Sequence, residues 1–192
     1  MKYLRVLIPV ALVLAVAACA KPPQADIDAA RASVDAAAKN ADVVAYAPDT
    51  LKSAQDKLAQ MDTELTAKHY DKVKTIAQDA KATADSAAGI AATNKQKAQA
   101  DATTLIDSLK TALPDASKKL AAAKKVRGVK LDFAGLTKQI NDAKTALADA
   151  DKDLAAGDFA SALQKATAIQ TQLTDGEKLI SDAIDAAKAG KK

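Results

Sequence analysis

The sequence has little of what catalytic and metal sites are built from: one histidine, one cysteine and no tryptophan. Structural zinc sites need four ligands, mostly cysteine and histidine, and catalytic ones need three, so this set is too small. A catalytic histidine also requires a nucleophile and an orienting partner, and no nucleophile motif accompanies His69. We therefore expect a non-enzymatic protein without a metal or other cofactor, and we interpret His69 as an exposed turn residue.

Long apolar runs are also scarce. The uncharged run from Val6 to Ala18 has 13 residues, whereas a membrane-spanning helix needs about 20. Lys2 and Arg5 precede this run, and the small residues Ala17 and Ala18 end it. Basic, apolar and small residues in this order are typical of a secretory signal. We predict that residues 1–18 are a signal peptide rather than a permanent anchor.

Val16-Ala17-Ala18-Cys19 resembles the bacterial lipobox, an aliphatic residue and two small residues before an invariant cysteine. The resemblance implies that the Cys19 thiol receives a diacylglyceryl group, that the signal is cut before Cys19, and that the new amine is acylated. Several acyl chains hold a protein firmly on a membrane. Ala20, in place of aspartate, favours the periplasmic face of the outer membrane over the inner membrane, by resemblance to enterobacterial sorting.

A strong excess of one charge is missing too. The 28 basic and 24 acidic residues are interleaved, which argues against a nucleic-acid partner. Lys2 and Arg5 leave with the signal, so the mature chain is less basic than the formal net charge of +4 indicates. Alanine, the best helix former, makes up about a quarter of the chain. The composition predicts an all-α fold with a thin core rather than a disordered chain.

Prolines, glycines and turn residues divide the mature chain into a tether at residues 19–24 and a series of helices. The expected helices cover residues 25–44, Pro48 to a turn at Lys68 and His69, 70–112, 114–126, 132–155 and 159–187. In the second of these, Leu51, Ala54, Leu58, Met61 and Leu65 follow the 3, 4, 3, 4 spacing of a heptad seam.

A shift of 89 residues aligns the second half of the chain with the first without a gap. Part of this agreement is ordinary helix periodicity, but both turns and the aromatic residues after them, Tyr70 and Phe159, also align. We interpret these aromatics as packing residues. We predict an elongated antiparallel bundle of long alanine-rich helices in two helix-break-helix-turn-helix units, at residues 25–113 and 114–192, with the second packed on the first.

Ala45-Tyr46-Ala47-Pro48, the leucine seam and His69-Tyr70-Asp71 are similar to a family of small bacterial lipoproteins with an uncharacterised helical-hairpin domain. The similarity is good over residues 1–90 and looser over 131–170, where Gly157-Asp158-Phe159 fits the turn but Tyr-Ala-Pro is missing. That family has no settled activity, so the resemblance implies location and fold more than function.

Three aspartates, Asp149, Asp151 and Asp153, alternate as in a calcium loop. Leu154 and Ala160 stand where that loop needs glycine and glutamate, and residues two apart on a helix do not share a face. We interpret the three as part of a solvated helix face.

The most unusual charge feature is a basic segment with no acidic residue between Ser117 and Leu131. Its basic residues are Lys118, Lys119, Lys124, Lys125, Arg127 and Lys130. They form either a solvated helix end or a surface for phospholipid headgroups, lipopolysaccharide phosphates or an acidic protein.

The expected function is that of a non-catalytic helical scaffold or interaction module in the periplasm, held on the membrane by the lipid on Cys19 and acting on envelope proteins or peptidoglycan. One alternative is a structural tether, because Lys192 resembles the C-terminal lysine through which Braun-type lipoproteins are joined to peptidoglycan. Another is a carrier for an apolar or anionic envelope molecule, which a helical bundle can hold between its helices.

Overall fold

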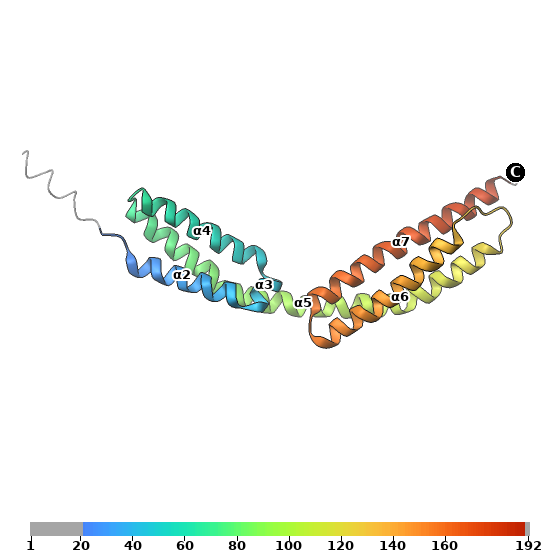
Figure 1. Cartoon of the computed structure of the whole chain (residues 1–192), viewed down its shortest axis with the longest axis horizontal. Helices are drawn as coiled ribbons and strands as arrows, with labels where there is room; N and C mark the ends of the chain where they lie inside the picture. The colour runs from blue at the N-terminus through green and yellow to red at the C-terminus, as the bar shows by residue number, and fades with distance from the viewer. Residues whose placement is uncertain (1–20, 191–192) are drawn as a thin grey trace, which may run out of the picture. The chain divides into compact units, whose positions relative to one another are not determined.

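Residues 21–190 are described by a computed structural model and form six helices without a strand (Figure 1). These are α2 (Gln24–Lys39), α3 (Ala41–Tyr46), α4 (Pro48–Thr66), α5 (Tyr70–Lys124), α6 (Phe133–Ala156) and α7 (Phe159–Ala189). The all-α helical bundle expected from the sequence is confirmed. None of the helices in this range combines the length and the apolar character that crossing a bilayer requires.

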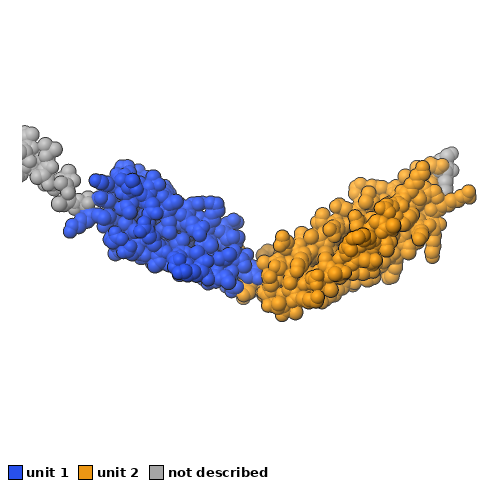
Figure 2. All heavy atoms as spheres, in the orientation of Figure 1, with its two compact units in different colours: residues 1–92 blue, residues 93–192 orange. Residues whose placement is uncertain are grey.

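The chain divides into two compact units, with the division between Ala92 and Thr93 (Figure 2). Unit 1 contains α2, α3, α4 and the first part of α5, and unit 2 contains the rest of α5 with α6 and α7. The helix α5 is therefore the last helix of unit 1 and the first helix of unit 2.

The core of unit 1 is built mainly from alanine. One cluster joins α2, α4 and α5 through Ile27, Ala30, Met61, Val73, Ala77 and Ala80. A second cluster contains Val34, Ala37, Val43, Ala47, Leu51, Ala54, Ala84, Ala87 and Ala91. Recurrence every three or four residues places these side chains on one face of each helix. Small side chains let the helices pack closely but bury little apolar area per residue, which is the thin core predicted from the composition.

The core of unit 2 has more large aliphatic side chains. Its main cluster joins α5, α6 and α7 through Ala102, Ile106, Leu109, Leu113, Ala143, Leu147, Ala150, Ala162, Ala166 and Ile169. A smaller cluster of Leu120, Ala123, Leu136 and Ile180 closes the end of the unit where α5 stops and α6 begins. These two clusters fix the C-terminal part of α5 against α6.

Pro114 does not end a helix, which contradicts the expected break between residues 112 and 114. α5 continues through Pro114 to Lys124. An interior proline normally costs a helix a hydrogen bond and a steric clash. Here Leu109, Leu113 and Leu120 remain buried at 2%, 1% and 6% exposure on both sides of the proline, while Pro114 itself faces solvent. Packing of this apolar face outweighs the local cost.

A second difference lies at Asn40, where the single helix expected at residues 25–44 is divided into α2 and α3. The Asn40 side chain accepts hydrogen bonds from the backbone N–H groups of Asp42 and Val43, at 3.0 and 3.3 Å. Asparagine is a strong N-cap, so it starts a new helix although the apolar pattern continues.

The α4–α5 and α6–α7 turns repeat each other as the shift of 89 residues predicts. In the first turn Lys68 N donates to Leu65 O and His69 N donates to Glu64 O, both at 3.0 Å. In the second, Gly157 N donates to Leu154 O at 3.2 Å and Asp158 N donates to Asp153 O at 2.9 Å. Each hairpin therefore ends its first helix with the same pair of bonds, which is a Schellman motif.

The similarity of the units extends to their first helices, which the sequence shift did not include. Arg31 of α2 pairs with Asp62 of α4 at 2.7 Å, and Lys110 of α5 pairs with Asp151 of α6 at 3.0 Å. Asp62 and Asp151 are equivalent in the two hairpins. Four residues before each cation lies a fully buried isoleucine, Ile27 or Ile106. Both units thus contain three long helices with a related core, and unit 1 has the short helix α3 in addition.

Candidate functional site

Two of the residues expected to carry function lie outside the described range of residues 21–190. They are Cys19, the predicted lipidation site, and Lys192, the predicted peptidoglycan attachment point. Both assignments stay predictions.

The basic segment lies at the end of α5 and in the connection to α6. Lys118, Lys119 and Lys124 belong to the last turns of α5, and Lys125, Arg127 and Lys130 follow in the connection. All six side chains are exposed. Lys124, Lys125 and Arg127 lie in or just after the last turn of α5. They also offset the partial negative charge at the C-terminal end of this helix.

Two of the six cations are neutralised by ion pairs that the sequence pattern did not reveal. Lys118 pairs with Asp115 at 3.0 Å, and Lys119 pairs with Glu177 of α7 at 2.9 Å. Within residues 21–190 the other four have no ion pair: Lys124, Lys125, Arg127 and Lys130. The unpaired positive charge is therefore concentrated where α5 ends, not along the whole segment.

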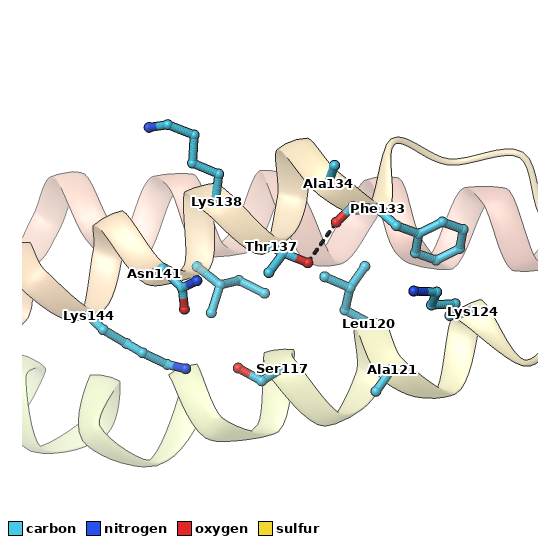
Figure 3. A pocket seen from close by; sticks show the side chains of 11 residues that line it. Ser117, Leu120, Ala121, Lys124, Phe133, Ala134, Thr137, Lys138, Asn141 and Lys144 are labelled. Carbon is cyan, nitrogen blue, oxygen red and sulfur yellow. Dashed lines mark hydrogen bonds between the residues drawn. The ribbon is translucent and has the colours of Figure 1, made fainter.

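A groove of about 860 Å³ runs between α5 and α6 and includes one of these four residues, Lys124 (Figure 3). It is lined by Ser117, Leu120, Ala121, Lys124, Phe133, Ala134, Thr137, Lys138, Ile140, Asn141 and Lys144. Lys124 belongs both to the groove and to the basic segment. The groove lies entirely in unit 2.

The start of α6 holds the groove in shape. The Asp132 carboxylate caps the helix by accepting a hydrogen bond from Gly135 N at 2.9 Å. One turn on, the Thr137 hydroxyl donates to the Phe133 carbonyl at 2.7 Å, which turns the threonine methyl group toward the groove side of the helix. Phe133 and Ile140 are partly buried and pack against the cluster that contains Leu120 and Leu136, so the floor is continuous with the core of unit 2.

The charges around this groove have one sign. Its lining includes three lysines and no carboxylate. Figure 3 shows Lys124 at the Phe133 end, Lys144 extending from the other end toward Ser117, and Lys138 pointing away from the floor. Lys138 pairs with Asp142 at 2.6 Å, which leaves Lys124 and Lys144 as the cations available to a bound group.

Two other surface grooves differ in charge. The groove between α5 and α7, of about 620 Å³, is lined by Lys119 and Lys178 but also by Glu177 and Asp182. The groove between α2 and α5 in unit 1, of about 380 Å³, contains Asp85 and no cation. Among these three grooves, a cationic lining is found only between α5 and α6.

His69 lies exposed at the α4–α5 turn, where its Nδ1 is 2.6 Å from Glu64 Oε2. This hydrogen bond, with the nearby Lys72 ammonium, lowers the pKa of the Glu64 carboxyl below its ordinary value. The Glu64 carboxylate is hydrogen-bonded to His69 and Lys72. Within residues 21–190, no nucleophilic side chain is hydrogen-bonded to this pair.

The three alternating aspartates each have a lysine partner. Asp149 pairs with Lys152 at 3.0 Å, Asp151 with Lys110 at 3.0 Å and Asp153 with Lys165 at 2.6 Å. No group of three metal-ligating side chains lies together within the described range. The aspartates serve ion pairs on and between helices.

Residues 25–103 match the model of a protein family described as a domain of unknown function, DUF4398. No curated protein and no solved structure shows significant similarity to the chain. The match supports the resemblance to an uncharacterised domain family. It includes the helical part of unit 1 except Gln24 and ends before the basic segment and the α5–α6 groove.

Proposed function

We propose that this protein is a lipid-anchored lipoprotein of the cell envelope and acts as a non-catalytic helical interaction module in the periplasm. The single observation that carries the interaction part is the group of four unpaired, exposed cations at the end of α5: Lys124, Lys125, Arg127 and Lys130. The partner surface is therefore anionic, on an envelope protein or on the envelope itself.

The lipobox ending at Cys19 supports the anchor. Residues 19–24 contain Pro22 and Pro23, and α2 begins directly after them at Gln24. The two prolines have no N–H to donate and α2 starts only after them, so this short segment can serve as a spacer between the lipid and the helical units. Several acyl chains, each contributing about 0.8 kcal/mol per buried methylene, make such an anchor stable.

Electrostatics supports the choice of an anionic partner. A cation near an anionic surface contributes on the order of 1 kcal/mol, and a cation already paired with a carboxylate contributes less. Lys118 and Lys119 have carboxylate partners, whereas the four cations at the end of α5 do not. Their contributions are therefore available for binding.

The test is crosslinking in living cells followed by mass spectrometry of the attached molecules. The natural chain is compared with Cys19→Ser, which cannot be lipidated, and with a variant in which the four unpaired cations are changed to glutamine. The matched control carries glutamine at four exposed lysines that have carboxylate partners and lie outside the α5–α6 groove: Lys39, Lys52, Lys152 and Lys178.

We expect one envelope protein to be captured by the natural chain and by the control, and to be lost from Cys19→Ser and from the quadruple variant. Capture that is unaffected by both changes contradicts the proposal. Recovery of Lys192 joined to a muropeptide instead supports the alternative of a tether between outer membrane and peptidoglycan. Recovery of the natural chain with an unmodified thiol at Cys19 contradicts lipid anchoring.

A further inference from the structure

We infer that the groove between α5 and α6 binds a monoacyl anionic amphiphile, a molecule with one acyl chain and a carboxylate or phosphate head. This goes beyond the proposed interaction module, because it assigns a ligand class to a defined cavity in unit 2. The inference rests on the shape, the apolar floor and the charge of this groove.

The floor suits an acyl chain. Leu120, Phe133 and Ile140 provide its large apolar side chains, and Ala121 and Ala134 add small ones. The lining residues of α6 run from Phe133 to Lys144, a distance of about 16 Å along the helix axis at 1.5 Å per residue. The apolar lining of α6 runs from Phe133 to Ile140, and Asn141 and Lys144 make the far end polar. The groove volume of about 860 Å³ lies in the range of pockets that hold small ligands.

The cations define where the head lies. Lys124 stands at the Phe133 end, next along the chain to Lys125 and close in sequence to Arg127 and Lys130. At the other end the alkyl stem of Lys144 lies along the groove with its ammonium near Ser117. Long lysine side chains commonly cover apolar surface with their stems while the charge stays in water. We place the anionic head at the Lys124 end.

Absence of acidic groups from the lining explains the choice of an anion. Three lysines, one serine, one threonine and one asparagine are the polar lining residues. A carboxylate or phosphate at the Phe133 end can accept a hydrogen bond from the Lys124 ammonium, and ammonium–oxyanion bonds are the stronger kind of hydrogen bond. The α5–α7 groove, which has both signs of charge, offers no such preference.

An acidic amphipathic helix fits the groove less well. A stable protein interface buries about 800 Å² on each partner, and it needs several exposed apolar anchors. Leu120 is already 6% exposed, and Phe133 and Ile140 are partly buried by the core of unit 2. The exposed apolar strip is therefore narrow, and one acyl chain covers it.

The experiment uses the full chain with Cys19→Ser, so that no covalent lipid competes for the groove. Because the natural sequence has no tryptophan, Phe133→Trp adds a single fluorophore at the groove. Monomeric dodecanoate is titrated against this protein, with dodecyl phosphate as a second anionic head and dodecyl maltoside as the neutral control. Calorimetry on the chain without the tryptophan checks that the reporter has not created the site.

Three variants test the placement. Lys124→Gln with Lys144→Gln removes the two available cations, and Lys152→Gln with Lys178→Gln removes two exposed lysines outside this groove. Ala121→Glu places a carboxylate on an exposed position of α5 at the groove wall. Circular dichroism verifies that each variant keeps its helix content.

We expect saturable binding of one dodecanoate or dodecyl phosphate per chain, with a blue shift of the tryptophan emission. The double change at Lys124 and Lys144 should weaken binding by about tenfold, the control pair should leave it unchanged, and Ala121→Glu should abolish it. Preference for one of the two heads identifies the head chemistry.

The inference is overturned if neither anionic probe binds saturably, or if dodecyl maltoside binds equally well and the lysine changes have no effect. It is also overturned if the chain binds phosphatidylglycerol vesicles but no monomeric probe, because the cations then act as a membrane contact. Binding of an acidic helical peptide in competition with dodecanoate would assign the groove to a protein partner. All of these measurements use the chain without a lipid on Cys19. Their outcome therefore does not affect the proposed lipid anchor or the crosslinking test.

Discussion

Lys68 and Gly157 occupy the same position in the two hairpin turns, and both have a left-handed backbone, with φ of 60° and 81°. Glycine adopts this conformation without a steric penalty, whereas a residue with a Cβ atom pays about 1 kcal/mol or more. The second hairpin therefore has the better residue for the turn, and the first is strained at an exposed lysine.

Lys68→Gly should stabilise the protein by about 1 kcal/mol, and Gly157→Ala should destabilise it by a similar amount. Urea unfolding of the purified chain measures both. Lys74→Gly, at an exposed position inside α5, is the control and should destabilise by about 1 kcal/mol. A loss of stability in Lys68→Gly would show that the strain at this turn is negligible.

Gly176 lies in the interior of α7 at the position that Ala87 occupies in unit 1. A Cβ atom there would meet only Leu136 Cδ2, at an ordinary contact distance of 3.7 Å. Gly176→Ala should raise the free energy of unfolding by about 1 kcal/mol, because alanine is the better helix former and its methyl group adds contact with α6.

Replacing Gly135 by alanine should have the opposite effect on stability. A Cβ atom at this position collides with the Asp132 carboxylate that caps α6. Gly135→Ala should lower the stability by about 1 kcal/mol, the usual effect of losing an N-cap. Thermal unfolding of the two variants side by side tests the pair, and equal shifts of the same sign would be inconsistent with this packing.

Pro114→Ala should stabilise α5, since it restores a backbone donor in the helix interior and removes the ring clash, together up to about 3 kcal/mol. Pro48→Ala should not stabilise α4, because Pro48 stands at the first helical position, where no intrahelical bond is lost. Hydrogen exchange of the amides around residue 114 and urea unfolding report the change. A gain in the Pro48 variant alone would contradict the role given to the helix position.

Glu64 makes the stability of unit 1 depend on pH in the acid range. Because its folded-state pKa is lowered, mainly by the His69 hydrogen bond, Glu64 binds a proton more readily in the unfolded chain. Its contribution is complete above the ordinary pKa of 4.5 and is lost as the pH falls through the lowered folded value.

We expect Glu64→Gln to have a lower melting temperature than the natural chain at neutral pH, and the two to converge as the pH falls below 4.5. His69→Gln should give a smaller effect in the same direction, since the Lys72 ammonium still faces the carboxylate. If the melting temperatures of the variant and the natural chain differ by the same amount at every pH, Glu64 does not contribute to the loss of stability in acid.

The sequence predicted both hairpins and the helix boundaries at Pro48 and between residues 126 and 132, but it added a break at Pro114 and missed the one at Asn40. Pro48, the turn at Lys68 and Gly157 all mark helix ends, because each has a local effect that no distant contact reverses. Pro114 was misjudged because the buried residues Leu109, Leu113 and Leu120 hold the helix across it. Such packing depends on α6 and α7, which the local pattern does not describe.

The sequence predicted the basic segment of the candidate site but not the groove beside it. The basic segment is visible as a charge pattern, but the pairing of Lys119 with Glu177 joins residues 58 positions apart, so the sequence overstated the free charge. Nothing in the sequence pattern indicated that residues of α6 line a groove. Thr137 and Lys144 are ordinary exposed helix residues until the register of α6 against α5 is known.

The sharing of α5 between the two units also affects how such a protein can grow during evolution. When the last helix of one unit is the first helix of the next, an added unit requires two new helices and not three. Duplication of a gene segment that encodes one hairpin is then sufficient, and the new hairpin finds an existing helix to pack on. A chain with one further unit would therefore differ from this one by a single duplication.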